Sequence, residues 1–100
     1  MIPNREDLAL SIDEAEWGVL RAHLGRGGLI LVDDRLDLAD TALRVASDDI
    51  EIIQHWVENG MIGKPSDSKI RSWDENKQKR FSMLIVSPFV LIQEKVPTFH

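Results

Sequence analysis

Three aspartates follow a short apolar run, and they form the pattern in this sequence best suited to metal or phosphoryl-transfer chemistry. The apolar run covers residues 29–32; Asp33 and Asp34 come directly after it, and Asp37 follows three residues after Asp34. A short apolar run bounded by turn signals indicates a buried strand. Carboxylates gathered at the end of a strand supply the oxygen ligands that magnesium prefers. A divalent-metal-dependent hydrolase or phosphotransferase is therefore one functional hypothesis.

The residues around these aspartates depart from established acidic motifs. The strand-ending pair resembles the receiver domains of response regulators, but only 67 residues follow Asp33, too few for the rest of that fold. A calcium-binding loop starting at Asp33 requires Gly and an acid at positions that Leu38 and Arg44 occupy. Carboxylates at a helix start instead bind free backbone amides and favour the positive end of the helix dipole. We predict that Asp37 begins a helix, and that a weakly held magnesium at Asp33, Asp34 and Asp37 is the alternative.

Other catalytic arrangements find no support in the sequence. His23, His55 and His100 lack metal-ligand spacing, and no strand-turn-helix elbow presents a serine. The glycines of residues 25–28 lie between a predicted helix and a strand, the reverse of the order in a phosphate-binding loop. The chain has no cysteine, which excludes thiol chemistry and zinc–thiolate or iron–sulfur centres. We expect no catalytic residue, no cofactor and no enzymatic activity.

Apolar spacing and capping signals predict helices over much of the chain. Ser11 with Glu14, and Asp48 with Glu51, have the spacing of capping boxes. Pro65 and the serine after it are suited to a further helix start. The predicted helices cover residues 11–24, residues from 37 to about 46, residues 48–59 and a segment beginning near residue 65.

The C-terminal third is predicted to be β-structure because it is dense in β-branched and aromatic residues. Strands are expected at residues 81–87 and 89–95. Pro88 cannot donate to a sheet ladder, so the pair is either a tight hairpin or one strand bent at Pro88. The length of the chain indicates one domain over residues 1–100. Residues 1–10 are expected to form an N-terminal arm and residues 96–100 a frayed tail.

The expected fold class is therefore α+β. A small sheet, built from a strand near residues 29–32 and the two C-terminal strands, packs against three to four helices. The element order also allows a winged-helix arrangement, whose recognition helix would cover residues 49–59. That segment has three acids and no Lys or Arg, so it would repel the phosphates of nucleic acid.

Charge is unevenly distributed along the chain, whose formal total is −5. Residues 1–63 hold five Arg and thirteen Asp or Glu, whereas residues 64–80 hold six basic and three acidic residues. The acidic front disfavours nucleic acid, and the basic segment 77–80 is suited to an acidic partner. Weak nucleic-acid binding through this segment is a further alternative. No apolar run is long enough to cross a membrane and no signal peptide is recognisable, so we expect a cytoplasmic protein without membrane contact.

Several segments together resemble a known family. The runs ILVDDRLDLADTALRVASDD, HWVENGMIGKPSD and LIVSPFVLIQE, together with Trp73, resemble small bacterial proteins grouped as domain of unknown function family 2288. The resemblance extends from about residue 11 to residue 94 and is most specific in LDLAD and VSPFVLIQ. It implies a bacterial, cytoplasmic, compact domain and supplies no mechanism.

We therefore expect a non-enzymatic protein-interaction or regulatory module. The motivation is the charge asymmetry together with strands that can leave an edge free for pairing. Self-association through residues 89–93 is one concrete form of this expectation. The predicted partner-binding residues are Lys77, Lys79, Arg80, Phe89, Leu91 and Gln93.

Overall fold

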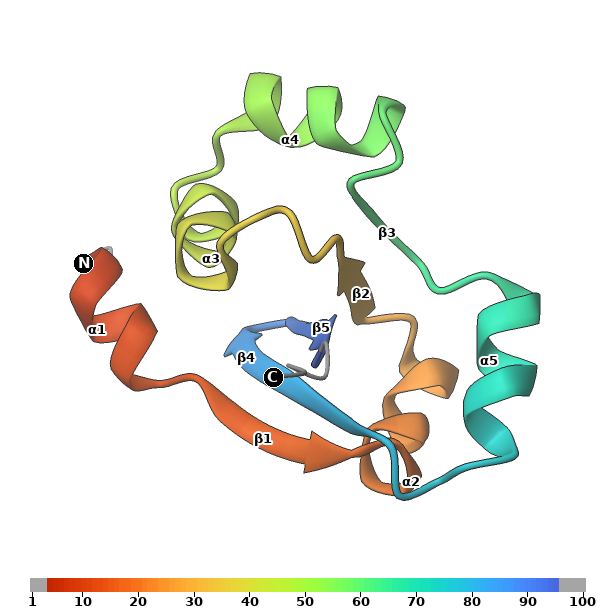
Figure 1. Cartoon of the computed structure of the whole chain (residues 1–100). Helices are drawn as coiled ribbons and strands as arrows, with labels where there is room; N and C mark the ends of the chain where they lie inside the picture. The colour runs from red at the N-terminus through yellow and green to blue at the C-terminus, as the bar shows by residue number, and fades with distance from the viewer. Residues whose placement is uncertain (1–3, 96–100) are drawn as a thin grey trace, which may run out of the picture.

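A five-stranded mixed sheet in the order β1-β4-β5-β2-β3 forms the centre of the molecule (Figure 1). The computed structural model describes residues 4–95. The elements in chain order are α1 (Arg5–Leu10), β1 (Asp13–Glu16), α2 (Trp17–Leu20), the 3-10 helix η1 (Arg21–Arg26), β2 (Leu29–Val32), α3 (Leu38–Ala46), α4 (Ile50–Glu58), β3 (Ile62–Gly63), α5 (Asp67–Asp74), β4 (Arg80–Val86) and β5 (Phe89–Glu94).

The hairpin of β4 and β5 lies in the middle of this sheet. The two strands pair antiparallel from Phe81↔Glu94 to Val86↔Phe89, with the turn at Ser87 and Pro88. This result decides the question that the sequence left open in favour of a hairpin. On its other side β5 pairs in parallel with β2, and β1 and β3 form the two edges.

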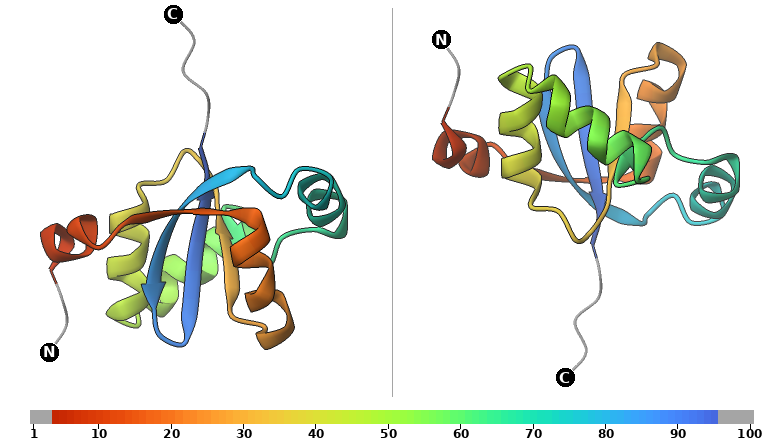
Figure 2. Two further views of the ribbon diagram at one scale, coloured as in Figure 1. Left: turned by 90° about the horizontal axis from the view of Figure 1, so that it is seen from below. Right: turned by 90° about the horizontal axis from the view of Figure 1, so that it is seen from above.

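The α+β fold class is confirmed, but the winged-helix form of that expectation is wrong. In a winged helix the C-terminal hairpin extends beside the helices. Here β5 is paired on both sides, and helices cover both faces of the sheet (Figure 2). β2 and β5 pair in parallel although β3 and β4 lie between them along the chain. A parallel pair needs a crossover connection, and the intervening helices provide it.

Each face of the sheet has its own apolar core. Strand residues alternate between faces, so adjacent residues such as Leu91 and Ile92 belong to different cores. The first core, under α1, α3 and α4, contains Leu8, Val32, Leu38, Ala39, Ala42, Ile62, Leu84 and Leu91. The second core, under α2 and α5, contains Trp17, Leu20, Leu29, Trp73, Phe81, Val90 and Ile92.

Three aromatic rings join α2 and α5 to β4 in the second core. The centroids of Trp17 and Trp73 are 4.8 Å apart, and those of Trp73 and Phe81 are 4.9 Å apart, both in edge-on arrangements. The indole Nε1 of Trp17 donates to Asp74 at 2.8 Å, so its buried polar atom is satisfied. These contacts fix α5, and with it one wall of the site described below.

Two local predictions from capping signals are wrong. Residues 13–16 form β1 instead of a first helical turn, and Ser11 ends α1 instead of beginning a helix. The competing interaction is non-local, because β1 pairs with β4 along Glu14↔Ser82 and its neighbours. The second wrong prediction is the capping box of Asp48 with Glu51. The N-cap of α4 is Asp49, which makes no side-chain hydrogen bond there, and Asp48 has a left-handed φ of 51°.

The other helix boundaries agree with the sequence analysis. The side chain of Asp37 accepts the Asp40 amide at the start of α3, and that of Ser66 accepts the Lys69 amide at the start of α5. Gly60, with φ of 71°, follows the end of α4. The predicted N-terminal arm contains α1, while the predicted tail at residues 96–100 lies outside the described residues. Within residues 4–95, no helix combines the length and apolar character needed to cross a membrane.

Candidate functional site

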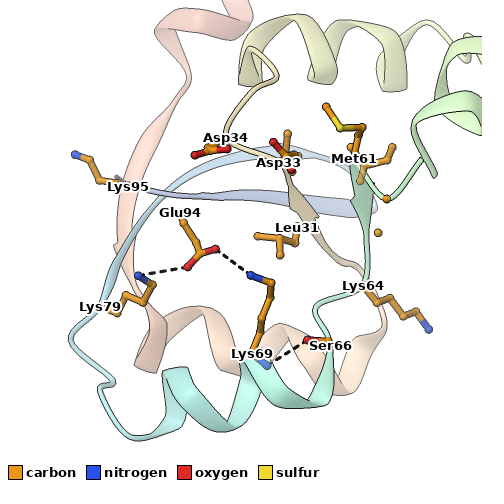
Figure 3. A pocket seen from close by; sticks show the side chains of 14 residues that line it. Leu31, Asp33, Asp34, Met61, Lys64, Ser66, Lys69, Lys79, Glu94 and Lys95 are labelled. Atoms are coloured by element: carbon orange, nitrogen blue, oxygen red, sulfur yellow. Dashed lines mark hydrogen bonds and ion pairs between the residues drawn. The ribbon is translucent and has the colours of Figure 1, made fainter. Parts of the chain in front are cut away.

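Two hollows meet at the edge strand β3, one on each face of the sheet. The first, which we term the lysine cleft, has a volume of about 520 Å³ and opens where β2 and β5 end, beside α5 (Figure 3). The second, which we term the apolar pocket, has a volume of about 200 Å³ and lies between α4 and the sheet. Both are lined by Ile62 and Gly63 of β3.

The lysine cleft is organised around one carboxylate. Glu94, at the end of β5, accepts a hydrogen bond from the ammonium group of Lys69 and forms an ion pair with that of Lys79, each at 3.4 Å. Figure 3 shows these two lysines converging on Glu94 from α5 and from the segment before β4. Lys79 also lies over the ring of Phe81, 5.7 Å from its centroid. Because both long lysine–glutamate pairs are partly exposed, they hold Glu94 only loosely.

Asp33 and Asp34 lie at one end of the lysine cleft, as Figure 3 shows. The Asp33 carboxylate accepts three hydrogen bonds from Arg35. The Nε and Nη2 atoms of Arg35 donate at 2.9 and 3.2 Å, and its backbone N–H donates at 2.9 Å. These side-chain and backbone hydrogen bonds lower the pKa of Asp33 to about 2. Asp33 is therefore a fixed anion at neutral pH, already balanced by a cation of the same loop.

Asp37 is not among the residues that line this cleft. Its carboxylate caps α3 and also accepts Arg5 Nη2 at 2.9 Å, while Arg5 Nε donates to Asp40. The prediction that Asp37 begins a helix is confirmed. Across residues 4–95 there is no group of three or more His, Cys, Asp or Glu side chains arranged to hold a metal ion.

The apolar pocket is bounded by an unusually exposed helix. No residue of α4 is buried, although five of its nine residues are apolar. Val57 is 53% exposed and Ile50 is 71% exposed. The pocket lining consists of Ile30, Val45, Asp48, Ile53, Val57, Ile62, Gly63, Phe89 and Leu91, and only one of these residues is charged.

Self-association through residues 89–93 stays a prediction, but a free sheet edge at these residues cannot be its basis. β5 pairs with β4 along its whole length and with β2 over residues 90–92, so it is a central strand and not an edge. Phe89 does reach the apolar pocket and is 38% exposed, whereas Leu91 is 1% exposed in the first core. The amide nitrogen of Gln93 donates to the carbonyls of Asp33 and Leu36 at 2.9 and 2.7 Å, so Gln93 braces the loop after β2.

The basic residues of segment 77–80 have separate neighbours. Lys79 belongs to the lysine cleft, and Arg80 donates to Glu14 of β1 at 3.0 Å. Lys77 is exposed, and its backbone carbonyl accepts the N–H of Gly18 at 2.9 Å. Arg80 and Lys79 are thus partly neutralised by acids of the same chain.

Sequence reasoning missed Lys64, Lys69 and the strand β3 that separates the two hollows. A two-residue strand such as Ile62–Gly63 contains no period to detect. Lys64 stands before a proline, where the backbone is extended, which was an available but weak signal. The apolar spacing of α4 was visible, but exposure of that face depends on how the helix packs.

The comparisons with known proteins agree with the fold and add no activity. The chain is similar to the NMR solution structure of PA1075 from Pseudomonas aeruginosa, with a TM-score of 0.79 and 29% identity, covering 93% of this chain and 87% of that chain. None of the curated proteins matches the sequence. The family model described as "Protein of unknown function (DUF2288)" matches residues 3–94. With nearly all of its length matched by that model, this chain belongs to the DUF2288 family.

Proposed function

We propose that this chain is a non-enzymatic protein-interaction module, with a regulatory role in the bacterial cytoplasm, and that it binds its partner at α4 and the apolar pocket. The observation that carries the proposal is the exposed apolar face of α4, which adjoins a hollow in the sheet surface. Contiguous exposed apolar surface beside a pocket is typical of protein-contact sites. The bacterial setting is supported by the source of the similar structure.

The energetics of α4 favour such a contact. Full burial of one Val or Ile side chain contributes about 1.5–3 kcal/mol. Val57 and Ile50 are more than half exposed, so most of that gain is still available to a partner. A pocket of about 200 Å³ has room for one or two apolar side chains, which is the size of a typical anchor. Polar residues on the same helix, such as Glu51 and Glu58, form a charged margin.

The aspartates fit a catalytic role less well. A general base works best when its pKa lies near the operating pH, and the pKa of Asp33 is lowered to about 2. Titration with magnesium or manganese while the melting temperature is followed tests this alternative. A metal-dependent rise that Asp33→Asn abolishes would favour a metal-dependent enzyme over the interaction module.

The proposal is tested by affinity purification from the native cell with matched variants. Val57→Glu places a charge at the mouth of the apolar pocket, whereas Val19→Glu places one on α2, at a side chain that is 66% exposed outside both hollows. We expect one partner to be recovered with the wild type and with Val19→Glu but lost with Val57→Glu. Equal recovery with both variants, or no specific partner with the wild type, contradicts the proposal.

A further inference from the structure

Within the part of the chain that the structure describes, the outer edge of β3 presents one backbone N–H and one backbone C=O that are unpaired. Val32 pairs with Ile62 and Leu31 with Gly63, and the N–H of Asp33 donates to Met61 O at 2.8 Å. Paired backbone groups alternate along an antiparallel strand. Gly63 therefore directs its N–H and C=O toward β2, and Ile62 directs its own away from the sheet.

These Ile62 groups lack a hydrogen-bond partner within residues 4–95. Ile62 is only 7% exposed as a residue because its side chain belongs to the first core. Unpaired N–H and C=O groups on an edge strand are a template for pairing with another chain. Next to it, Gly63 has no atom within 4 Å of the position that a Cβ would occupy, so the sheet face beside this edge is open there. Figure 1 shows β3 at the rim of the sheet, between α4 and α5.

The charge beside this edge is positive and unbalanced at Lys64. Among residues 4–95 no carboxylate lies within ion-pair distance of Lys64, whereas Lys69 and Lys79 share Glu94. Figure 3 shows the Lys64 side chain directed away from the Lys69–Glu94–Lys79 group. A carboxylate arriving along β3 would therefore meet Lys64 without displacing an existing partner.

We propose that the β3 edge receives an extended segment of the partner protein as an additional strand, with an apolar residue opposite Ile62 and an acidic residue next to it. This inference rests on the proposed function and specifies how the partner binds. A residue opposite Ile62 lies on the same face as its side chain, toward Val57 and the apolar pocket. The neighbouring residues point to the other face, where Lys64 lines the lysine cleft.

Charge complementarity favours a partner protein over a second copy of this chain. Pairing of β3 with β3 across a two-fold axis centred on Ile62 would place Lys64 opposite Gly60 of the other copy. The segment 60–64, Gly-Met-Ile-Gly-Lys, contains no carboxylate that would answer Lys64. A segment with adjacent apolar and acidic residues satisfies both faces at once.

The probe is a labelled heptapeptide with blocked ends, a central leucine, a glutamate on each side of it and threonine elsewhere. We expect the peptide to add antiparallel to β3, with its leucine opposite Ile62 and one of the two glutamates next to Lys64. We expect saturable binding by fluorescence anisotropy, and shifts of the Ile62, Gly63 and Lys64 amide resonances in 15N-labelled full-length protein. Peptide binding that shifts only resonances distant from β3 overturns the inference.

N-methylation of the peptide separates strand addition from other modes of binding. In this antiparallel pairing the N–H of the central leucine faces Ile62, so its methylation is expected to weaken binding about tenfold, the effect of one lost hydrogen bond. The N–H of a neighbouring glutamate points to solvent, so its methylation is expected to change affinity by less than about threefold. Equal losses for the two peptides overturn the inference.

Charge variants test the acidic residue and keep the two proposals distinguishable. Lys64→Glu is expected to weaken binding of the peptide about threefold or more. The matched variant Lys77→Glu lies in an exposed segment outside both hollows and is expected to leave the affinity for the peptide unchanged. If Val57→Glu still abolishes partner recovery while the peptide never contacts Ile62, the strand model fails and the interaction surface on α4 stands. If both fail, the interaction module itself is wrong.

Discussion

Gly28→Ala is the substitution whose cost can be worked out most directly from the structure. A Cβ at Gly28 would lie 2.8 Å from the carbonyl oxygen of Pro88, where ordinary contact begins at 3.4 Å. The three nearest atoms, the carbonyl O and C of Pro88 and the Cα of Phe89, all belong to the backbone, so no flexible side chain can move aside. The same place carries the hydrogen bond from Val90 N–H to Gly28 O at 2.8 Å, which begins the parallel pairing of β2 with β5.

Relief of this contact requires a shift of about half an ångström between β2 and the β4–β5 turn. Overpacking of this kind costs about 1–3 kcal/mol. For a domain of about 100 residues each kcal/mol lowers the melting temperature by about 4–8 °C. We therefore expect Gly28→Ala to melt roughly 5–20 °C below the wild type.

Urea unfolding followed by tryptophan fluorescence measures the difference in unfolding free energy, and thermal unfolding with the same signal measures the difference in melting temperature. Both are reported by Trp17 and Trp73, which are buried in the second core. Gly25→Ala is the matched control, since nothing lies within 4 Å of its added Cβ. At a compatible position this exchange is neutral or stabilising by about 0.4–1 kcal/mol. If Gly28→Ala were as stable as Gly25→Ala, the close approach of the turn to β2 would be refuted.

Three further predictions concern the loop after β2. Gln93→Leu leaves two backbone carbonyls without their donor, so we expect urea unfolding to show a loss of about 1–3 kcal/mol of unfolding free energy. The control Gln54→Leu, on exposed α4, should change the unfolding free energy by no more than about 0.5 kcal/mol in the same urea titration. Asp37→Ala removes the cap of α3 and is expected to lower stability by about 1 kcal/mol by urea unfolding, and unchanged stability would contradict the capping role. Because hydrogen bonds from Arg35 lower the pKa of Asp33 to about 2 from 3.8, the stabilisation from this pair is complete above about pH 3.8 and disappears as the pH falls through about 2. An NMR titration of the Asp33 carboxyl carbon with a midpoint near 3.8 would contradict that pairing.

The sequence predicted most reliably those features whose signals are local. Asp37 and Ser66 cap helices as expected, because the donor amide lies only three residues away. The strands after residue 80 were recognisable because β-branched and aromatic residues are concentrated there. Membership of the DUF2288 family was likewise visible in runs such as LDLAD.

Features that depend on distant pairing were missed. Residues 13–16 have a capping pattern, yet the ladder to β4 and the ion pair between Glu14 and Arg80 make them a strand. The parallel pairing of β5 with β2 is equally non-local. Because β5 is central, its backbone cannot serve as the free edge that the sequence analysis expected, and the free edge lies at β3.

The residues of the candidate site could be predicted only in part from the sequence, for the same reason. Phe89 was expected to contact a partner and does line the apolar pocket. Lys64 and Lys69 are brought beside β5 only by the crossover through α4 and β3, which no local pattern in the sequence specifies. The sequence predicted a helix over residues 48–59 but not how it packs, and in the structure α4 leaves Val57 half exposed.

Site-specific photo-crosslinking in living cells tests the central claim most directly. A photoreactive amino acid at position 57 lies at the mouth of the apolar pocket, and the same group at position 19 lies on α2, outside both hollows. The interaction module predicts a discrete, heavier adduct at position 57 and none at position 19. Absence of an adduct at position 57, or the same adduct at both positions, would contradict the claim.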